Sequence, residues 1–375
     1  MDKEQLWFSS YQFNSDVQSQ LDTSEVSWKY QMAATEYAHN GSYQKALEAR
    51  AMEQPGRSFR PVSAEDSLEF VVHYRPVDAL EYLANRAKDY QIVIINEAHH
   101  AAKHRNFTRK LLEQLSEQGF KHLGLETLGD EDVEFNKRGY PLISSGYYSR
   151  EAQFGNMIRA ALEIGFQVFP YEYTGEGSGD PRERGQAERI KAYLEKYPGE
   201  KVIIHCGYAH VNKGRYPPWG KAMAGRVMEL TGLEPLTINQ EKYSEQFSKA
   251  YLNGVRKLDL PFKKPIVFVD QGGNSYGRSE NVDVYVWHEN TTFTQGRPDW
   301  IFDGEFKPVE IRWEDDLGEV LVQASKKVES QDAVPIDMVC VANGSNSVYL
   351  SLPAGSFLIR IFNHEVLIEK ELFVE

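Results

Sequence analysis

The sequence has few cysteines, no long apolar run and no excess of positive charge, and each lack excludes a class of protein. Only Cys206 and Cys340 occur in 375 residues, so neither a disulfide framework nor a cysteine zinc site is expected. No window approaches the roughly eighteen apolar residues of a membrane-spanning helix. The 42 basic and 55 acidic side chains give a net charge of −13, which disfavours nucleic acid or an anionic membrane as the main partner.

Several enzyme motifs are missing as well. No Gly-x-Gly-x-x-Gly follows an apolar run, and the chain has neither a P-loop nor a Gly-x-Ser-x-Gly turn. The glycine cluster at 174–181 carries two acidic side chains that would repel phosphate. The length and a hydrophobic content of 41% predict an ordinary globular protein of two or three domains.

Three patterns follow one another along the chain. Residues 28–39 favour a helix, Asn40-Gly41 breaks it, and Ser42 is a candidate N-cap for a second helix from Tyr43, with a spacing like that of a tetratricopeptide repeat. Apolar runs at 92–95, 122–125, 167–169 and 201–204 then alternate with amphipathic helical segments, and runs at 266–269 and 282–286 are expected to complete a parallel sheet. Beyond about 304, short strand patterns predominate.

We therefore predict an α/β fold with a mostly parallel sheet and helices on both faces. A helical hairpin at 1–62 precedes the α/β domain at 63–303, and a small antiparallel, β-sandwich-like domain occupies 304–375. No chemistry is apparent in the last of these.

Carboxylates and imidazoles follow the predicted strands directly, where an open parallel sheet binds its ligands. The strand ends carry Glu97, His99, His100 and His104 after the first run, Glu126 after the second, Glu172 after the third, and Tyr208 and His210 after the fourth. A neutral imidazole can accept a proton from water, and a carboxylate can orient that imidazole. The same groups could instead hold a divalent cation. A single such residue is more often a cap or a solvated side chain, but their convergence indicates one site.

The two turns that carry these residues are alike. Asn96-Glu97-Ala98-His99 and Gly207-Tyr208-Ala209-His210 each have a histidine at the fourth position. A site built from two similar half-units explains this better than chance. Nearby, the loop with Ser144, Ser145, Tyr147 and Tyr148 is a weaker candidate for substrate contact, as are Trp219 and Trp300 for lining a pocket.

These turns resemble the superfamily that joins ChaN-like haem-uptake proteins, Tiki and TraB-type proteins and erythromycin esterases. The motifs lie between about 90 and 240, and the resemblance covers residues about 90–300. Glu126 matches the glutamate after the second strand, and Arg182, or alternatively Arg189, matches a basic residue before the second turn. Asn96 replaces the first glycine of the pattern, which is tolerable because asparagine also reaches left-handed backbone angles. The spacing is most similar to the exported ChaN-like branch, whereas the esterase spacing would select His100 instead of His99.

The resemblance implies ester hydrolysis, metal-dependent proteolysis or haem binding. Our first hypothesis is a hydrolase for an ester or peptide bond, in a small molecule or a peptide, in which Glu97, His99 or His100, Glu126 and His210 activate water. In a metal-assisted version His99, Glu126 and His210 hold a divalent ion, and Glu172 and Arg182 contact the substrate. The alternative is a haem- or metal-binding protein with His104 or Tyr208 as ligand. A catalytically silent scaffold is a third reading, but it leaves the clustering of His and Glu unexplained.

The residues 1–5 lack a signal-peptide pattern, which taken literally predicts a cytoplasmic protein. The likeness to the ChaN-like branch instead favours export with the signal removed.

Overall fold

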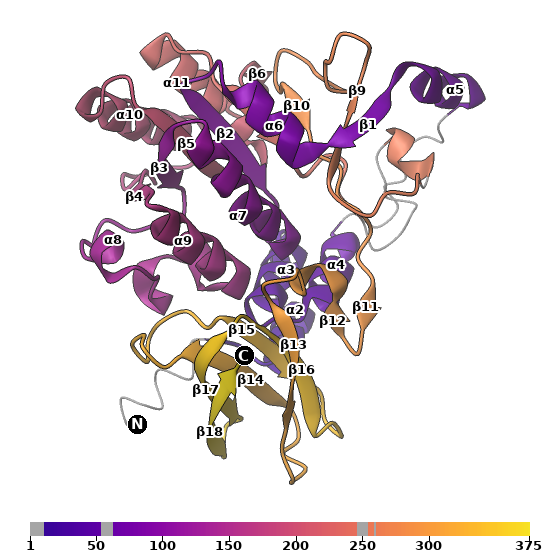
Figure 1. Ribbon diagram of the computed structural model, residues 1–375, viewed down its shortest axis with the longest axis vertical. Coiled ribbons are helices and arrows are strands. Elements are labelled where there is room, and N and C mark those ends of the chain that lie inside the picture. Colours follow the sequence, from indigo (N-terminus) through magenta and orange to yellow (C-terminus); the bar gives the residue numbers. More distant parts are fainter. Residues whose placement is uncertain (1–10, 54–62, 246–253, 259) are drawn as a thin grey trace.

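The structure is a computed structural model that describes residues 11–53, 63–245, 254–258 and 260–375 (Figure 1). At its centre is a six-stranded sheet in which every neighbouring pair of strands is parallel. In spatial order the strands are β10 (Val284–Tyr285), β8 (Leu236–Asn239), β2 (Ile92–Glu97), β5 (Lys201–Gly207), β3 (Phe120–Leu125) and β4 (Gln167–Pro170). The predicted α/β class and the four main strands are thus confirmed.

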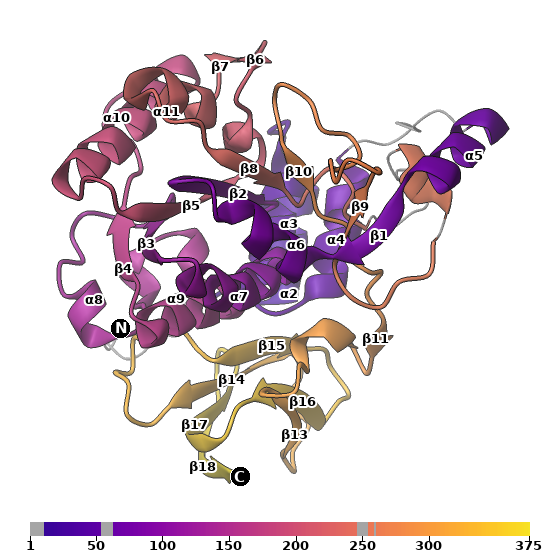
Figure 2. The ribbon, with the colours of Figure 1, turned by 45° about the horizontal axis from the view of Figure 1, so that its top comes forward.

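Helices cover both faces of this sheet (Figure 2). On one face Val93, Ile95 and Ile203 pack against α6 (Ala79–Ala87), α7 (Ala102–Glu117) and α9 (Ala152–Ile164). On the other, Ile94 and Ile204 pack against α10 (Asp180–Lys196) and α11 (Met223–Thr231). Because successive strand residues alternate between faces, apolar runs without alternation are what a sheet buried on both sides requires.

The strand order brings the two similar turns together. After β2 the chain crosses to β3 and β4, and it then returns through α10 to insert β5 between β2 and β3. The register pairs Glu97 with Gly207, so both strands end side by side. The loops after β2, β3, β4 and β5 therefore meet at one edge of the sheet.

The prediction for residues 266–269 was wrong. This strand, β9 (Ile266–Val269), pairs antiparallel with β1 (Arg75–Asp78) and lies outside the central sheet, where β10 instead occupies the place beside β8. Its residues alternate between two buried clusters. A strand buried on both sides has the same apolar pattern in a two-stranded pair as in a large sheet, so the sequence alone could not distinguish them.

The N-terminal helices pack onto the rest of the molecule. They are α2 (Asn14–Thr23), α3 (Lys29–His39), α4 (Tyr43–Met52) and α5 (Ala64–His73). The predicted hairpin corresponds to α3 and α4, but the Ser42 side chain forms no capping bond, and Asn40 Oδ1 instead accepts from the Ser42 amide at 3.1 Å. The Cys340 amide donates to Asn40 O at 2.9 Å, which ties the hairpin turn to the C-terminal strands. The predicted boundary at residue 62 lies outside the described residues.

The C-terminal strands are antiparallel, as predicted. One sheet has the order β15 (Asp337–Val341), β14 (Val320–Lys326), β17 (Gly355–Phe362) and β18 (Leu367–Val374), and β13 (Lys307–Arg312) pairs with β16 (Ser347–Leu352). A shared apolar core lies between them. The sequence missed β13 and β18, since both are largely exposed and carry charged residues.

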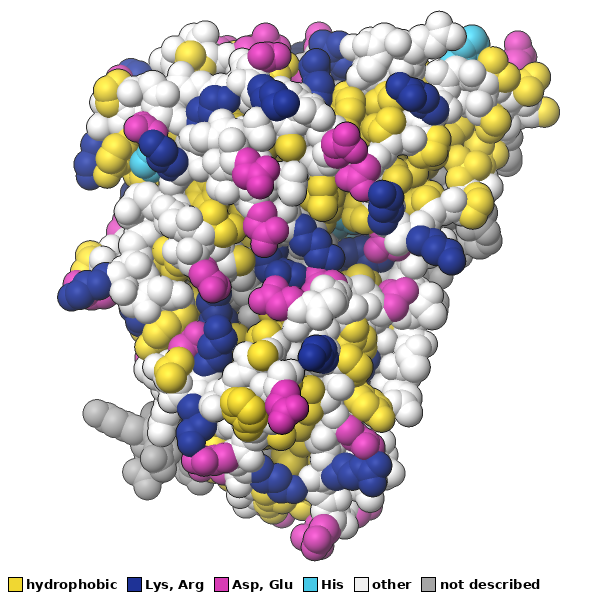
Figure 3. Space-filling model, viewed as in Figure 1, with side chains coloured by type: hydrophobic (Ala, Val, Ile, Leu, Met, Phe, Trp, Pro, Cys, Tyr) yellow, Lys and Arg dark blue, Asp and Glu magenta, His cyan; other side chains and the backbone are white. Residues whose placement is uncertain are grey.

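The remaining elements are short. They are α8 (Phe135–Arg138), β6 (Arg215–Tyr216), β7 (Gly220–Lys221), β11 (Phe293–Thr294) and β12 (Arg297–Pro298), with 3-10 turns η1 (Ile143–Ser145), η2 (Tyr148–Arg150), η3 (Tyr208–Val211), η5 (Gly254–Leu258) and η6 (Asp299–Ile301). In the described chain we find no helix with the length and apolarity of a membrane span. Acidic and basic side chains are interspersed over the face in Figure 3, without a patch of one sign.

The turn between α3 and α4 offers a test of this packing. Gly41 has φ +75°, and a β-carbon there would overlap the Met338 carbonyl of β15. We expect Gly41→Ala to lower the free energy of unfolding by roughly 3 kcal/mol, from backbone strain plus displacement of β15. Gly119 has φ +86° and open space around it, so Gly119→Ala should cost only about 1 kcal/mol. Urea denaturation measures both, and equal losses would contradict the docking of the hairpin.

Candidate functional site

A buried carboxylate–imidazole pair lies at the end of β2. The Glu97 carboxylate receives two hydrogen bonds from Arg105 of α7, at 2.6 and 2.7 Å, and the His99 Nδ1 lies 2.9 Å from its Oε1. Burial opposes ionisation, but the Arg105 guanidinium and His99 hold the pKa of Glu97 well below its usual range. Because Glu97 is an anion, we assign the proton of this contact to His99 Nδ1, which leaves Nε2 as a base.

Arg105 connects this pair to the N-terminal hairpin. Its Nη1 donates to Glu151 Oε2 at 3.0 Å, and the Tyr43 hydroxyl of α4 donates to Glu151 Oε1 at 2.7 Å. Glu151 also caps α9 by accepting the amides of Gln153 and Phe154, both at 2.9 Å. The Glu97, Arg105 and Glu151 side chains are no more than 2% exposed. The hairpin is therefore joined to the imidazole through an unbroken series of buried contacts.

Neighbouring rings and one glycine fix the position of His99. Its ring stacks on Tyr148, with centroids 3.6 Å apart, and meets Tyr208 edge-on at 4.8 Å. A β-carbon on Gly207 would be only 2.6 Å from His99 Nε2 and 3.4 Å from Glu126 Oε2. Glycine at this position thus lets the imidazole and the Glu126 carboxylate approach the same point.

The second half of the site surrounds Arg182, near the start of α10. Its guanidinium donates to Glu126 Oε1 at 2.6 Å and to Glu172 at 2.6 and 2.9 Å, and its Nη1 lies 2.9 Å from His210 Nε2. Burial raises the pKa of Glu126, but His210 and Arg182 outweigh it and lower the pKa to about 2. The Arg182 and Glu172 side chains are each 28% exposed, so this ion pair borders solvent while Glu126 and His210 are buried.

His210 also has a carboxylate partner. Its Nδ1 lies 2.8 Å from Glu183 Oε2, which accepts the Met223 amide at 2.7 Å as well. Burial lowers the pKa of His210, but Glu126 and Glu183 together raise it above its ordinary value. The ring stacks on Trp219, with centroids 5.0 Å apart. In its neutral form His210 donates from Nδ1 and accepts from Arg182 at Nε2.

The structure gathers most of the predicted residues into one cluster. Glu97, His99, Glu126, Glu172, Arg182 and His210 belong to it, whereas Arg189 pairs with Asp130 instead. His100 points elsewhere and lines a neighbouring pocket with His104. Of the two alternatives, His99 contacts Glu97 and His100 lines the pocket, and which of them is the catalytic imidazole stays a prediction.

Three participants were missed by the sequence analysis. Arg105 was unremarkable because helix interiors often carry charged residues on a solvated face, and Glu151 precedes a helix as its N-cap, yet both are fully buried. Glu183 adjoins the predicted Arg182, and this adjacency was a signal that could have identified it. Tyr148 and Trp219, weak candidates for substrate or pocket contact, stack on the two imidazoles instead.

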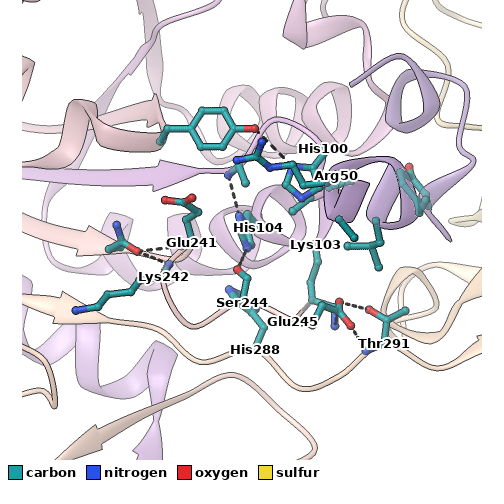
Figure 4. Close-up of a pocket in the computed structure, with 18 of the residues that line it drawn as sticks. Arg50, His100, Lys103, His104, Glu241, Lys242, Ser244, Glu245, His288 and Thr291 are labelled. Carbon is teal, nitrogen blue, oxygen red and sulfur yellow. Dashed lines mark hydrogen bonds and ion pairs between the residues drawn. The ribbon is translucent and has the colours of Figure 1, made fainter. Parts of the chain in front are cut away.

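A pocket of about 430 Å³ adjoins the two turns (Figure 4). His100, His104 and Tyr208 line it, together with side chains from α4 and from the segments after β8 and β10. His104 Nδ1 accepts the Ala98 amide at 3.0 Å and its Nε2 lies 2.8 Å from Ser244 Oγ. Both nitrogens of His104 are therefore engaged, and burial lowers its pKa to about 3.

The donor set does not fit the predicted metal triad of His99, Glu126 and His210. The Arg182 guanidinium is bonded to Glu126 and faces His210 Nε2, where a metal ion would need lone pairs of both groups. Among the residues that the structure describes, no three His, Cys, Asp or Glu side chains are arranged to hold a metal ion. Arg182 supplies the positive charge that the carboxylates require.

The haem ligands predicted from sequence fit no better. His104 has no free nitrogen, as described above. Burial raises the pKa of the Tyr208 hydroxyl far above its ordinary value, which disfavours the phenolate that binds iron.

Comparisons with known proteins give distant structural likeness alone. No family model and no curated protein sequence matches the chain. The chain is similar to the type III effector HopBA1 (12% identity, TM-score 0.38) and to a haem-binding ChaN of Campylobacter jejuni (11%, 0.34), each over 58% of this chain and 98% of the other. It is also similar to RRSP, a MARTX toxin effector domain from Vibrio vulnificus (17%, 0.30), over 56% of this chain and 44% of that one. A ChaN protein is thus among the similar structures, but membership of the predicted superfamily stays a prediction.

The pairing of Glu183 with His210 can be tested by titration. We expect Glu183→Gln to lower the pKa of His210, because a carboxylate that raises it is removed. A pKa that is raised in the folded state stabilises the fold. This stabilisation is complete below the unfolded pKa of 6.5 and is lost as the pH rises through the folded pKa. The variant should therefore lose stability chiefly at acidic pH. NMR titration of the ring measures the shift. Glu188→Gln, on an exposed position of the same helix, is the control, and an unchanged His210 would contradict the pairing.

Proposed function

We propose that this protein is a hydrolase that cleaves an ester or peptide bond with water activated by His99. The observation that carries the proposal is the contact between Glu97 and His99. The ionised Glu97 carboxylate lies 2.9 Å from His99 Nδ1, while no described residue bonds to His99 Nε2. Carboxylate–imidazole pairs of this kind are the usual general bases of hydrolases. A β-carbon on Gly207 would lie 2.6 Å from Nε2 and 3.4 Å from Glu126 Oε2, and the Glu126 carboxylate in turn accepts from Arg182.

Proton and charge transfer can be assigned to particular atoms. His99 Nε2 takes a proton from water as the water oxygen attacks the acyl carbon, and the carbonyl electrons move to the oxygen. The Arg182 guanidinium, partly exposed and rigidly held by Glu126 and Glu172, is suited to stabilise that oxyanion. Collapse of the intermediate breaks the bond to the leaving group, which takes the proton that His99 accepted from water.

The second imidazole is held by contacts on both ring nitrogens. Its Nδ1 lies 2.8 Å from Glu183 Oε2, and its Nε2 faces Arg182 Nη1 at 2.9 Å. Glu97 and Glu183 thus hold two imidazoles in different roles: Glu97 orients the base His99, and Glu183 orients a ring that supports Arg182. One imidazole that first accepts a proton from water and then returns it to the leaving group is sufficient for hydrolysis.

Haem binding, the alternative suggested by the sequence, has less support from the side chains. His104 and Tyr208 offer no ready iron ligand, and charged residues line the adjoining pocket. A Soret band that appears on haem addition and is lost in Tyr208→Phe would favour it over hydrolysis.

Substitutions at the first turn test the base. We expect His99→Ala, and Gly207→Ala through displacement of the His99 ring, to lower kcat/KM by about 10²- to 10⁴-fold, measured on a panel of aryl esters, alkyl esters and fluorogenic peptides. His122→Ala removes an imidazole at the opposite end of the sheet, where it contacts Tyr193, and should leave the rate unchanged. Full activity in the folded His99→Ala variant would refute the assignment.

The role of Arg182 predicts the response to metal removal. Because its guanidinium occupies the position between Glu126 and His210, we expect hydrolysis to survive prolonged dialysis against a chelator. Arg182→Lys should lower kcat by roughly 10²-fold or more, since one ammonium cannot reproduce the bidentate contacts. Loss of activity on chelation with recovery on adding one divalent metal would show that a metal ion acts here instead.

A further inference from the structure

The pocket of about 430 Å³ shares the η3 turn with the proposed hydrolytic cluster. Tyr208 forms a wall between them, with one edge against the His99 ring and its hydroxyl 3.5 Å from His100 Nδ1. Tyr216, another lining residue, packs on Trp219, and Trp219 stacks on His210. A group bound in this pocket would therefore be one aromatic ring, Tyr208, from His99 and two rings, Tyr216 and Trp219, from His210.

The backbone of Tyr208 is held in an unfavourable conformation. Its φ is +38°, in the left-handed region, which costs a non-glycine residue about 1 kcal/mol or more. A hydrogen bond of 2.7 Å from Asn96 Nδ2 to the Tyr208 carbonyl holds this turn in place. Glycine would relieve the strain, so the presence of a tyrosine indicates that its ring has a use at this wall.

Most charges that line the pocket are neutralised by partners. Arg50 forms an ion pair with Glu53, and Lys103 lies 3.2 Å from Glu245 and 3.8 Å from Glu289. The Lys242 ammonium lies over the Tyr285 ring at 4.5 Å and extends away from Lys103 and His104 (Figure 4). Burial lowers the pKa of His100 and His104 and raises that of Glu241, so these three groups favour their neutral forms.

Aromatic side chains make up much of the remaining wall. They come from α4, from η3 and its following loop, and from the segments after β8: Tyr43, Tyr208, Tyr216, Tyr285, Phe293 and Trp300. Flat rings with neutral imidazoles and hydroxyls between them favour a ligand with an aromatic face and hydrogen-bonding groups. A charged ligand would find few unpaired opposite charges in this pocket.

We propose that the pocket binds an uncharged aromatic ring of the substrate, with Tyr208 between that ring and the hydrolytic cluster. This inference rests on the proposed hydrolase function in that it calls the ligand a substrate. The binding of the ring itself does not depend on catalysis. It also gives the N-terminal hairpin a function, since α4 supplies Tyr43, Leu47 and Ala51 to the pocket.

Binding can be measured without turnover in the His99→Ala variant. Isothermal titration with N-acetyltyrosinamide should give a dissociation constant at least tenfold lower than with N-acetylalaninamide, which has the same amides and no ring. Tyramine and 4-hydroxyphenylacetate, the cationic and anionic analogues, should also bind at least tenfold more weakly. Equal binding of the alanine compound, or tighter binding of either charged compound, overturns the proposal.

Substitutions that fill the pocket, compared with a similar substitution outside it, test where the ring binds. Ala51→Phe adds a ring inside the pocket and should weaken N-acetyltyrosinamide at least tenfold, whereas Met52→Phe adds one to an exposed neighbouring position of α4 and should not. Leu47→Trp repeats the test should Ala51→Phe fold poorly. If the ring binds but no ester or peptide is cleaved, the proposed hydrolase fails and the pocket stands. If hydrolysis occurs without preference for aromatic substrates, the pocket assignment fails alone.

Discussion

The site depends on one buried cation, the Arg105 guanidinium, which lies between two buried carboxylates. Glu97 and Glu151 would repel each other and lose hydration without it, and removing one member of such a buried group costs roughly 3–5 kcal/mol. Arg105 satisfies both carboxylates and also donates to the His99 carbonyl at 3.0 Å. The turn after β2, helix α7, the first turn of α9 and the hairpin residue Tyr43 are all fixed through this group. His99 can keep one defined orientation only because Glu97 is held in this way.

The sheet topology supplies the second half of the site. Insertion of β5 between β2 and β3 sets the turn that carries His210 beside the turn that carries His99. Glycine at 207 permits the close approach of the His99 ring, and Arg182 from the start of α10 closes the cluster between Glu126 and Glu172. Each half thus pairs a carboxylate with an imidazole, but the first contains a buried arginine behind the carboxylate and the second has an arginine at the surface. This difference in the position of the cation separates the proposed base, His99, from the imidazole that supports Arg182.

The sequence predicted what depends on local pattern. Unbroken apolar runs identified β2, β3, β4 and β5, and the polar residues after them identified Glu97, His99, Glu126 and His210, because strand ends in a parallel sheet meet at one edge. It could not assign β9 to its separate pair, since a strand buried on both sides has the same composition in either setting. Nor could it distinguish Arg105 and Glu151 from solvated helix residues, because their partners come from segments far apart in the chain. The pocket and its aromatic lining were not predicted either, because they arise from tertiary contacts of the hairpin.

The proposed water activation depends most directly on which ring nitrogen of His99 carries a proton. The ¹⁵N chemical shifts of its ring, measured at neutral pH in the intact protein, report which nitrogen carries the proton. With an ionised Glu97 at Nδ1, we expect a proton on Nδ1 and a bare Nε2, and we expect Glu97→Gln to weaken this preference. A ring protonated at Nε2 with a bare Nδ1 would contradict it, since such a histidine could not take a proton from water beside Gly207.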